Sequence, residues 1–174
     1  MKEMARYGLI LAMICLAASA SLAGMDALTK SRIEDQAKSE EEQGLKAVLP
    51  EAADFKPVKS GGQIIYYKAY DQGGNFFGAA FKASGKGYSS IIEAIAGMRK
   101  DGTIVAIKIL SQNETPGLGS RVAEPEFREK FSNRNIAELG GVQAITGATI
   151  SSRAVIDSVK AKAEEVKGLI DHEK

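Results

Sequence analysis

The feature that most limits how this 174-residue chain can fold is an uncharged stretch near its N-terminus. Residues Tyr7 to Met25 contain no Asp, Glu, Lys or Arg and are rich in Leu, Ile, Ala and Met. As a helix that rises about 1.5 Å per residue, this stretch is just long enough to cross a hydrocarbon core of about 30 Å. The sequence therefore predicts a cytoplasmic tail and a single transmembrane helix within residues 1–28.

Two basic residues indicate the orientation of this helix. Lys2 and Arg6 precede the apolar stretch, and the positive-inside rule keeps such a tail in the cytoplasm. The rest of the chain is then expected on the extracytoplasmic side of the inner or plasma membrane. A cleaved signal peptide is the alternative, with Ala18-Ser19-Ala20 as a cleavage site. The apolar run exceeds the usual signal core of about 7–15 residues, which favours a retained anchor.

The charged segment that follows is predicted to be a helical connector over residues 29–50, ended by Pro50. The remaining residues, 51–174, are predicted to form one domain. The net charge is +1 and no basic stripe is present, so nucleic acid is not expected as a partner. The chain contains one Cys and one His, and a metal centre built from these residues is not expected.

Four strands are predicted in the first half of this domain. Residues Gln63 to Tyr70 and Asn75 to Lys82 flank an Asp-Gln-Gly-Gly turn and are expected to form a hairpin. Ile91 to Arg99 is a third strand or a mixed apolar segment, and Thr103 to Leu110 follows after a tight turn. The last strand alternates regularly and is apolar on nearly both faces, which predicts a central place in the sheet.

The second half of the domain is predicted to be helical. A helix is expected over Ala123 to Phe131, with Phe127 and Phe131 packed on the sheet, followed by a loop to Gly141. A final helix buries the apolar positions Val159, Ala163, Val166 and Ile170 and frays after Leu169. The fold class is therefore α+β, with a mainly antiparallel sheet and flanking helices.

Hydroxyl residues gather at the start of the final helix. The run is Thr146-Gly147-Ala148-Thr149-Ile150-Ser151-Ser152. Ser and Thr are common N-caps, which is the simplest interpretation. The free N–H groups and positive dipole end of a helix also favour an anion such as phosphate, and Gly147 and Ala148 leave room for it. The residues alone leave both interpretations open.

Two further glycine-containing segments lie upstream. One is Glu114-Thr115-Pro116-Gly117-Leu118-Gly119, whose Pro-Gly and Gly-x-Gly pairs predict a loop. The other is Gly85-Lys86-Gly87-Tyr88-Ser89, which reads as a flexible connection between strands.

These three segments resemble the motifs of the FMN-binding domain family. That family includes the G subunit of the Rnf complex and the C subunit of the sodium-pumping NADH:quinone reductase. In those proteins FMN is joined through its phosphate to the second threonine of the Thr-Gly-Ala-Thr motif, and the matching position is Thr149. The family pattern usually has an aspartate three residues before the first Thr or Ser, where this chain has Gln143.

The resemblance also implies which residues surround the flavin. Backbone amides near Gly147 and Ala148, together with Thr146, Ser151 and Ser152, are expected around the phosphate. The flavin pocket is expected to be lined by Glu114, Thr115, Gly117 and Leu118, with Tyr88 nearby.

A function in electron transfer follows from the resemblance. The sequence shows no nucleophile–base pair, so the cofactor would carry the chemistry. The expected protein is an electron-carrier subunit of an Rnf-type ferredoxin:NAD oxidoreductase, with no substrate turnover of its own. Its partners would be the other membrane subunits of that complex and a magnesium-dependent flavin transferase. The alternatives are another extracytoplasmic covalent-FMN carrier, or a flavin-free assembly domain.

Overall fold

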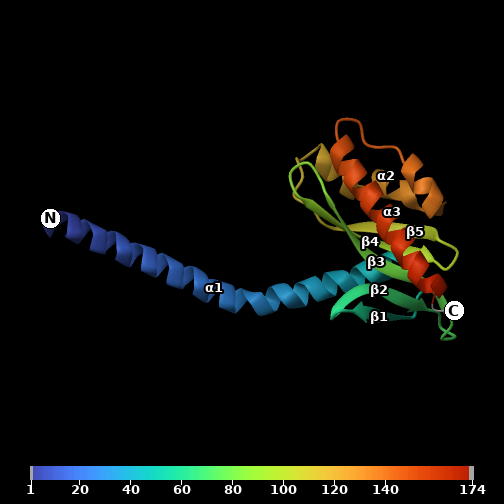
Figure 1. The fold of residues 1–174 in the computed structure, drawn as a ribbon, viewed down its shortest axis with the longest axis horizontal. Helices are drawn as coiled ribbons and strands as arrows, with labels where there is room; N and C mark the ends of the chain where they lie inside the picture. Colours follow the sequence, from blue (N-terminus) through green and yellow to red (C-terminus); the bar gives the residue numbers. More distant parts are fainter. Residues whose placement is uncertain (1, 173–174) are drawn as a thin grey trace. The chain divides into compact units, whose positions relative to one another are not determined.

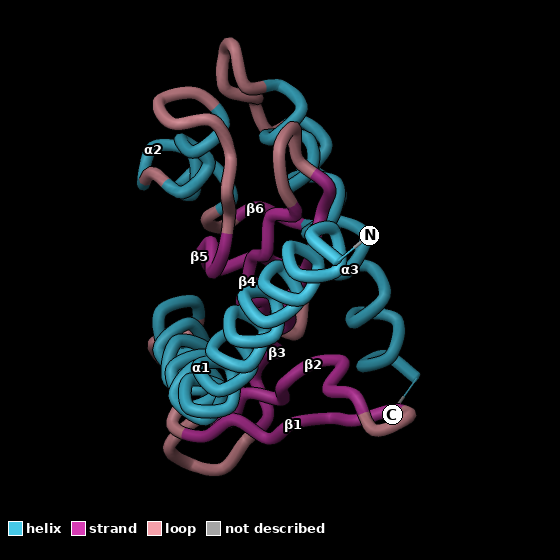
Figure 2. The backbone as a smooth tube through the Cα atoms, turned by 90° about the vertical axis from the view of Figure 1, so that its left-hand side faces the viewer, coloured by secondary structure: helices cyan, strands magenta, loops and turns pink. Residues whose placement is uncertain are grey.

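The strands of the sheet follow one another in space in the same order as in the sequence. The computed structural model describes residues 2–172. Within them every neighbouring pair of strands is antiparallel, so the predicted mainly antiparallel sheet and α+β class are confirmed. Figure 2 shows this order. The strands are β1 (Asp54–Ser60), β2 (Gln63–Tyr70), β3 (Phe76–Lys86), β4 (Ile91–Arg99), β5 (Thr103–Ser111) and β6 (Arg134–Asn135).

Strand β1 was not predicted from the sequence. It pairs only with β2 and forms an edge of the sheet, where Pro57 is tolerated because one side of an edge strand needs no ladder hydrogen bonds. Only Phe55 and Val58 are partly buried, so the strand lacks the alternation of apolar and polar residues by which strands are recognised.

Strand β5 lies near the other edge, and its predicted central place is wrong. It is fifth in the order and pairs on its outer side only with the two-residue β6. Both of its faces are apolar because both are covered: Ile104 and Ile107 lie in the larger core, while Val105 and Leu110 pack against a smaller one. An irregularity in the pairing with β4 puts Ile104 and Ile107 on the same face, which interrupts the predicted alternation.

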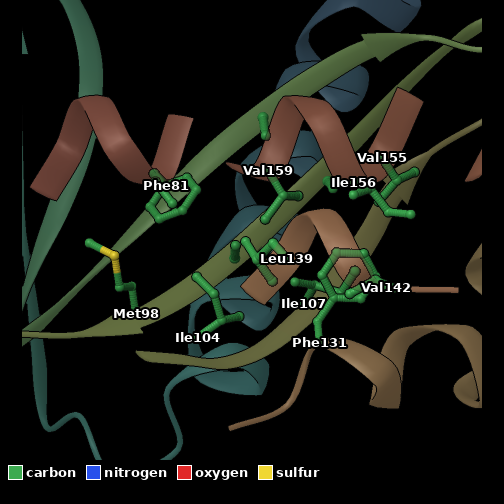
Figure 3. Packing of buried hydrophobic residues seen from close by; sticks show 14 of the residues in the cluster. Phe81, Met98, Ile104, Ile107, Phe131, Leu139, Val142, Val155, Ile156 and Val159 are labelled. Carbon is green, nitrogen blue, oxygen red and sulfur yellow. The ribbon is translucent and has the colours of Figure 1, made fainter. Parts of the chain in front are cut away.

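The larger core lies between one face of the sheet and helix α3 (Thr149–His172), which crosses the strands in Figure 1. The four predicted apolar positions of α3, from Val159 to Ile170, are all buried, so the predicted helix face is confirmed. Helix α3 continues past Leu169 to His172 with Ile170 buried, and the last two residues of the tail that was expected to fray lie outside the described residues. Figure 3 shows Val155, Ile156 and Val159 packed towards strand residues.

The segment before α3 is less regular than predicted. In place of one helix it forms the 3₁₀ turn η1 (Gly119–Ala123), the short helix α2 (Pro125–Arg128) and the 3₁₀ turn η2 (Glu129–Phe131). Phe127 and Phe131 nevertheless pack edge to face at 5.4 Å in the core, as expected. The predicted loop up to Gly141 contains β6 and the 3₁₀ turn η3 (Ile136–Gly141).

The opposite face of the sheet is covered by the end of helix α1 (Lys2–Val48). Leu45, Val48 and Leu49 form the smaller core with side chains of β2, β3 and β4. A Cβ on Gly97 of β4 would lie 2.4 Å from the Val48 carbonyl oxygen, so glycine is needed for this close approach. The Glu41 carboxylate also accepts a hydrogen bond from the Tyr67 hydroxyl and pairs with Lys82.

The chain divides into two compact units, residues 1–40 and 41–174. In the first unit the described side chains of the uncharged stretch are exposed, and α1 there is long and apolar enough to cross a membrane. The helix ends at Val48, two residues before Pro50. The proposed boundaries at residues 28/29 and 50/51 stay a prediction.

Candidate functional site

One cavity of about 550 Å³ lies where three loop segments meet at the start of α3. Its walls come from the turn after β3, the loop after β5 and the first turn of α3. The lining residues are Tyr88, Glu114, Thr115, Leu118, Gly119, Gly147, Ala148, Thr149, Ile150 and Ser151. A volume of this size suits a small organic cofactor.

Most of the residues singled out in the sequence meet around this cavity, and three do not line it. Gly117 lies in the same loop, where its N–H donates to the Ser120 hydroxyl. Thr146 borders a separate cavity of about 340 Å³. Ser152 is fully buried within the first turn of α3.

Two lining residues were missed by the sequence analysis. Gly119 belongs to the Gly-x-Gly pair that predicted a loop, and this pair is the feature of the sequence that indicates a special backbone at the cavity wall. Ile150 occupies the variable position of the Thr-Gly-Ala-Thr-x-Ser-Ser motif and is 55% exposed. Nothing in the local sequence indicates that this side chain borders a cavity.

The start of α3 presents backbone donors at the cavity wall. The helix begins at Thr149, so the N–H groups of its first residues have no acceptor within the helix. Gly147 precedes it with φ of +82°, a conformation that L side chains rarely adopt. The chain thereby turns into the helix at Thr149, an exposed residue that lines the cavity. This geometry suits an anion.

The two serines of the motif use their hydroxyl protons within the protein. Ser151 donates to the Glu114 carboxylate at 2.6 Å. Ser152 donates to the Ala148 carbonyl at 2.8 Å and accepts from the Ile145 N–H at 3.0 Å. A hydroxyl has one proton, so neither serine can also donate to a phosphate in this arrangement. The expected place of Ser151 and Ser152 around a phosphate stays a prediction, and in this structure their hydroxyl protons serve the Glu114 carboxylate and the Ala148 carbonyl.

Glu114 joins the three walls of the cavity. Its carboxylate is buried and accepts hydrogen bonds from the N–H groups of Tyr88, Ser89 and Ser90 at 2.9–3.1 Å. The hydroxyls of Ser90 and Ser151 donate to it as well. One side chain therefore fixes the turn after β3, its own loop and the first turn of α3.

Two glycines leave the space that Glu114 occupies. A Cβ on Gly87 would lie 2.5 Å from Glu114 Oε1, and one on Gly119 would lie 2.7 Å from the Ser151 hydroxyl oxygen. Both distances are too short for any side chain. Glycine in these two loops thus permits the buried carboxylate network.

Glu114 stays ionised over a wide pH range. Burial by itself raises the pKa of a carboxyl group, but the hydrogen bonds from Ser151 and from the N–H groups of Ser90, Ser89 and Tyr88 outweigh it and lower the pKa from 4.5 to about 2. Because the folded-state pKa is depressed, the stabilisation is complete above pH 4.5 and is lost as the pH falls towards 2.

This pKa shift makes a prediction about stability. At neutral pH, Glu114→Gln is expected to lower the free energy of unfolding by about 2 kcal/mol, since buried donors lose a charged acceptor. The difference between the two proteins should shrink between pH 4.5 and pH 2. Urea unfolding of both purified chains, followed by circular dichroism at several pH values, measures it. A difference that does not change with pH would contradict the assigned ionisation.

The described part of the chain contains no group of three or more His, Cys, Asp or Glu side chains arranged to hold a metal ion. The cavity is lined by three exposed residues that carry hydroxyls, Tyr88, Thr115 and Thr149, by apolar side chains and by the buried Glu114 carboxylate, with the backbone N–H groups of the first residues of α3 at its wall.

Comparison with known proteins agrees with the motifs. Residues 87–164 match the FMN-binding domain family, a range that contains every residue lining the cavity. Residues 1–48 match the RnfG N-terminal region. The crystal structure of NqrC from Shewanella oneidensis is also similar, with a TM-score of 0.49 and 18% identity over 70% of this chain and 74% of that one.

One curated relative matches nearly the whole chain and another matches 70% of it. The G subunit of the ion-translocating oxidoreductase complex of Methanosarcina acetivorans is 32% identical over 95% of this chain and 95% of its own length. The G subunit of the proton-translocating ferredoxin:NAD(+) oxidoreductase complex of Clostridium ljungdahlii is 32% identical over 70% of this chain and 69% of its own. With the apolar part of α1, these matches indicate a membrane-anchored protein. The chain belongs to the family of G subunits of ion-translocating oxidoreductase complexes and contains an FMN-binding domain.

Proposed function

We propose that this chain is the electron-carrier subunit of a membrane-bound Rnf-type ferredoxin:NAD oxidoreductase complex and holds FMN covalently at Thr149. Its relatives carry the names of such subunits and its second half is an FMN-binding domain. The observation that carries the proposal is the position of Thr149, an exposed residue at the start of α3 that lines the cavity.

The residues around the cavity fit the two ends of FMN. The phosphate would lie on the N–H groups of the first turn of α3, where Gly147 leaves the backbone open. The apolar side chains of Leu118 and Ile150 and the ring of Tyr88 would contact the flat ring system of the flavin. Ser151 and Ser152 would support this arrangement from below through Glu114 and the backbone.

Attachment needs a flavin transferase and an activated donor. The Thr149 oxygen would form a new bond to the flavin phosphorus of a flavin dinucleotide. The bond between its two phosphates would break, with AMP as the leaving group, and the hydroxyl proton would be released. The exposed position of Thr149 leaves it open to such an enzyme. Thr146 borders a different cavity and is the alternative acceptor that a test has to exclude.

Bound FMN supplies electron transfer, which the side chains of the protein cannot provide. The chain would hold the flavin in place, shield one part of it from water and present another part to a partner. The other membrane subunits of the complex are the proposed partners. Lys2 and Arg6 favour a domain on the extracytoplasmic side, where a covalent link keeps a cofactor that no free pool would replace.

One experiment tests this function. The chain is produced together with a flavin transferase, separated on a denaturing gel under ultraviolet light, and digested for peptide mapping by mass. Fluorescence that survives denaturation, with the mass of FMN on the peptide that contains residues 144–153, is the expected result. A folded chain without fluorescence would favour the flavin-free assembly domain and would mean that Gln143 or another change has disabled the attachment site.

A further inference from the structure

The charge of Glu114 is balanced by dipoles and not by a cation. Among the described residues its carboxylate has the five hydrogen-bond donors given above, and no ion pair with a Lys or Arg is found. Hydrogen bonds stabilise a carboxylate but leave its net charge in place. The side chain is 6% exposed, so water screens this charge poorly.

This charge lies on the wall of the cavity. Glu114, Ser151 and Thr149 line the same space, and the hydroxyl of Ser151, in the first turn of α3, donates to the carboxylate. A group bound in the cavity therefore experiences a fixed negative charge through a medium of low effective dielectric constant.

We propose that the buried Glu114 carboxylate sets the midpoint potential of a flavin in this cavity below the value that the same site with a neutral side chain would have. The inference rests on the proposed function. Reduction adds an electron to the flavin, and a nearby like charge makes that addition less favourable. Glu114 thus holds the three cavity segments in position and also contributes a negative electrostatic potential to the cavity.

The effect of the charge can be separated from the effect of loop positioning by the sign of the shift in midpoint potential that two substitutions cause. Glu114→Gln removes the charge at nearly constant volume and is expected to raise the midpoint potential. Ser151→Ala keeps the charge but removes one donor from the carboxylate, so the negative potential in the cavity becomes stronger and the midpoint potential should fall. Loosening of the site would shift both variants in the same direction.

The experiment is a potentiometric titration of the flavin absorbance in the purified, flavin-loaded chain with reference dyes. Covalent loading of each variant is first checked by fluorescence on a denaturing gel. Glu138→Gln, which removes one exposed carboxylate from η3, is the matched control and should leave the potential unchanged. Glu114→Asp keeps the charge and should stay nearer to the wild type than Glu114→Gln does.

The outcomes distinguish this inference from the proposed function. Shifts of opposite sign in Glu114→Gln and Ser151→Ala support it. Loaded variants with the wild-type potential, or with shifts of the same sign, overturn it and leave the electron-carrier function intact. If Glu114→Gln fails to fold or load, the sign of the shift in Ser151→Ala decides, and a rise there overturns the inference. A wild-type chain without flavin overturns the proposed function and this inference together.

Discussion

Replacement of Thr149 by valine is expected to abolish covalent flavin attachment completely while the domain stays folded. The substitution removes the only atom of this side chain that can bond to phosphorus and keeps its branched shape. Thr149 is exposed, so the effect on the free energy of unfolding should stay within about 0.5 kcal/mol. Fluorescence on a denaturing gel measures the attachment, and circular dichroism during heating measures the fold.

The neighbouring threonine supplies a matched control for this experiment. Thr146→Val removes a hydroxyl three residues earlier, beside the separate smaller cavity, and should retain the flavin. Thr149→Ser keeps an oxygen nucleophile and should retain at least part of the attachment. Loss of the flavin in Thr146→Val but not in Thr149→Val would reassign the acceptor, and loss in neither variant would refute an ester at either of these two threonines.

Gly85→Ala is expected to be the most destabilising of the proposed substitutions. A Cβ at this position of β3 would lie 2.3 Å from the Ala154 carbonyl oxygen of α3, and a helix backbone cannot yield as a flexible side chain would. Helix α3 would have to move away from the sheet that it covers. We expect a loss of about 3 kcal/mol, near the upper end for overpacking, and a midpoint temperature lower by about 6–12 °C.

Thermal unfolding followed by circular dichroism checks this effect. Ser84→Ala changes the preceding, exposed residue of the same strand and should leave the midpoint temperature within about 2 °C of the wild type. Since Thr149 begins the helix that would move, Gly85→Ala should also reduce the yield of covalent flavin. An unchanged midpoint temperature would mean that α3 is not packed this closely on β3.

Several features of the fold could be predicted because they depend on neighbours in the sequence. The buried face of α3 and the strands β2 to β5 are indicated by the spacing of apolar residues and by turn residues, which are patterns that extend over only a few positions. Strand β1 was not predicted because an edge strand buries few side chains and therefore shows little alternation of apolar and polar residues. The place of β5 was predicted wrongly. Apolar residues on both faces of a strand indicate only that both faces are covered, and a strand near the edge of a sheet can be covered on both faces too.

The candidate site also has features that local motifs predict and features that depend on contacts between distant segments. The motifs identified the residues that meet at the cavity, since each motif is a short local segment with its own backbone requirements. The hydrogen bond between Glu114 and Ser151, 37 residues apart, could not be read from either segment alone. It gives Ser151 a contact with a buried carboxylate that its own motif does not indicate.

The sequence by itself determined the apolar stretch near the N-terminus, the positions of strands β2 to β5 along the chain, the buried face of α3 and the threonine at its start. These depend on local propensity and spacing, which are properties of the chain before it folds. Only the tertiary structure decided that a buried carboxylate joins three loops and that glycines at positions 85, 87 and 119 stand where backbone or Glu114 comes too close for a side chain. Contacts between distant segments arise from packing in three dimensions, and no local pattern in the chain records them.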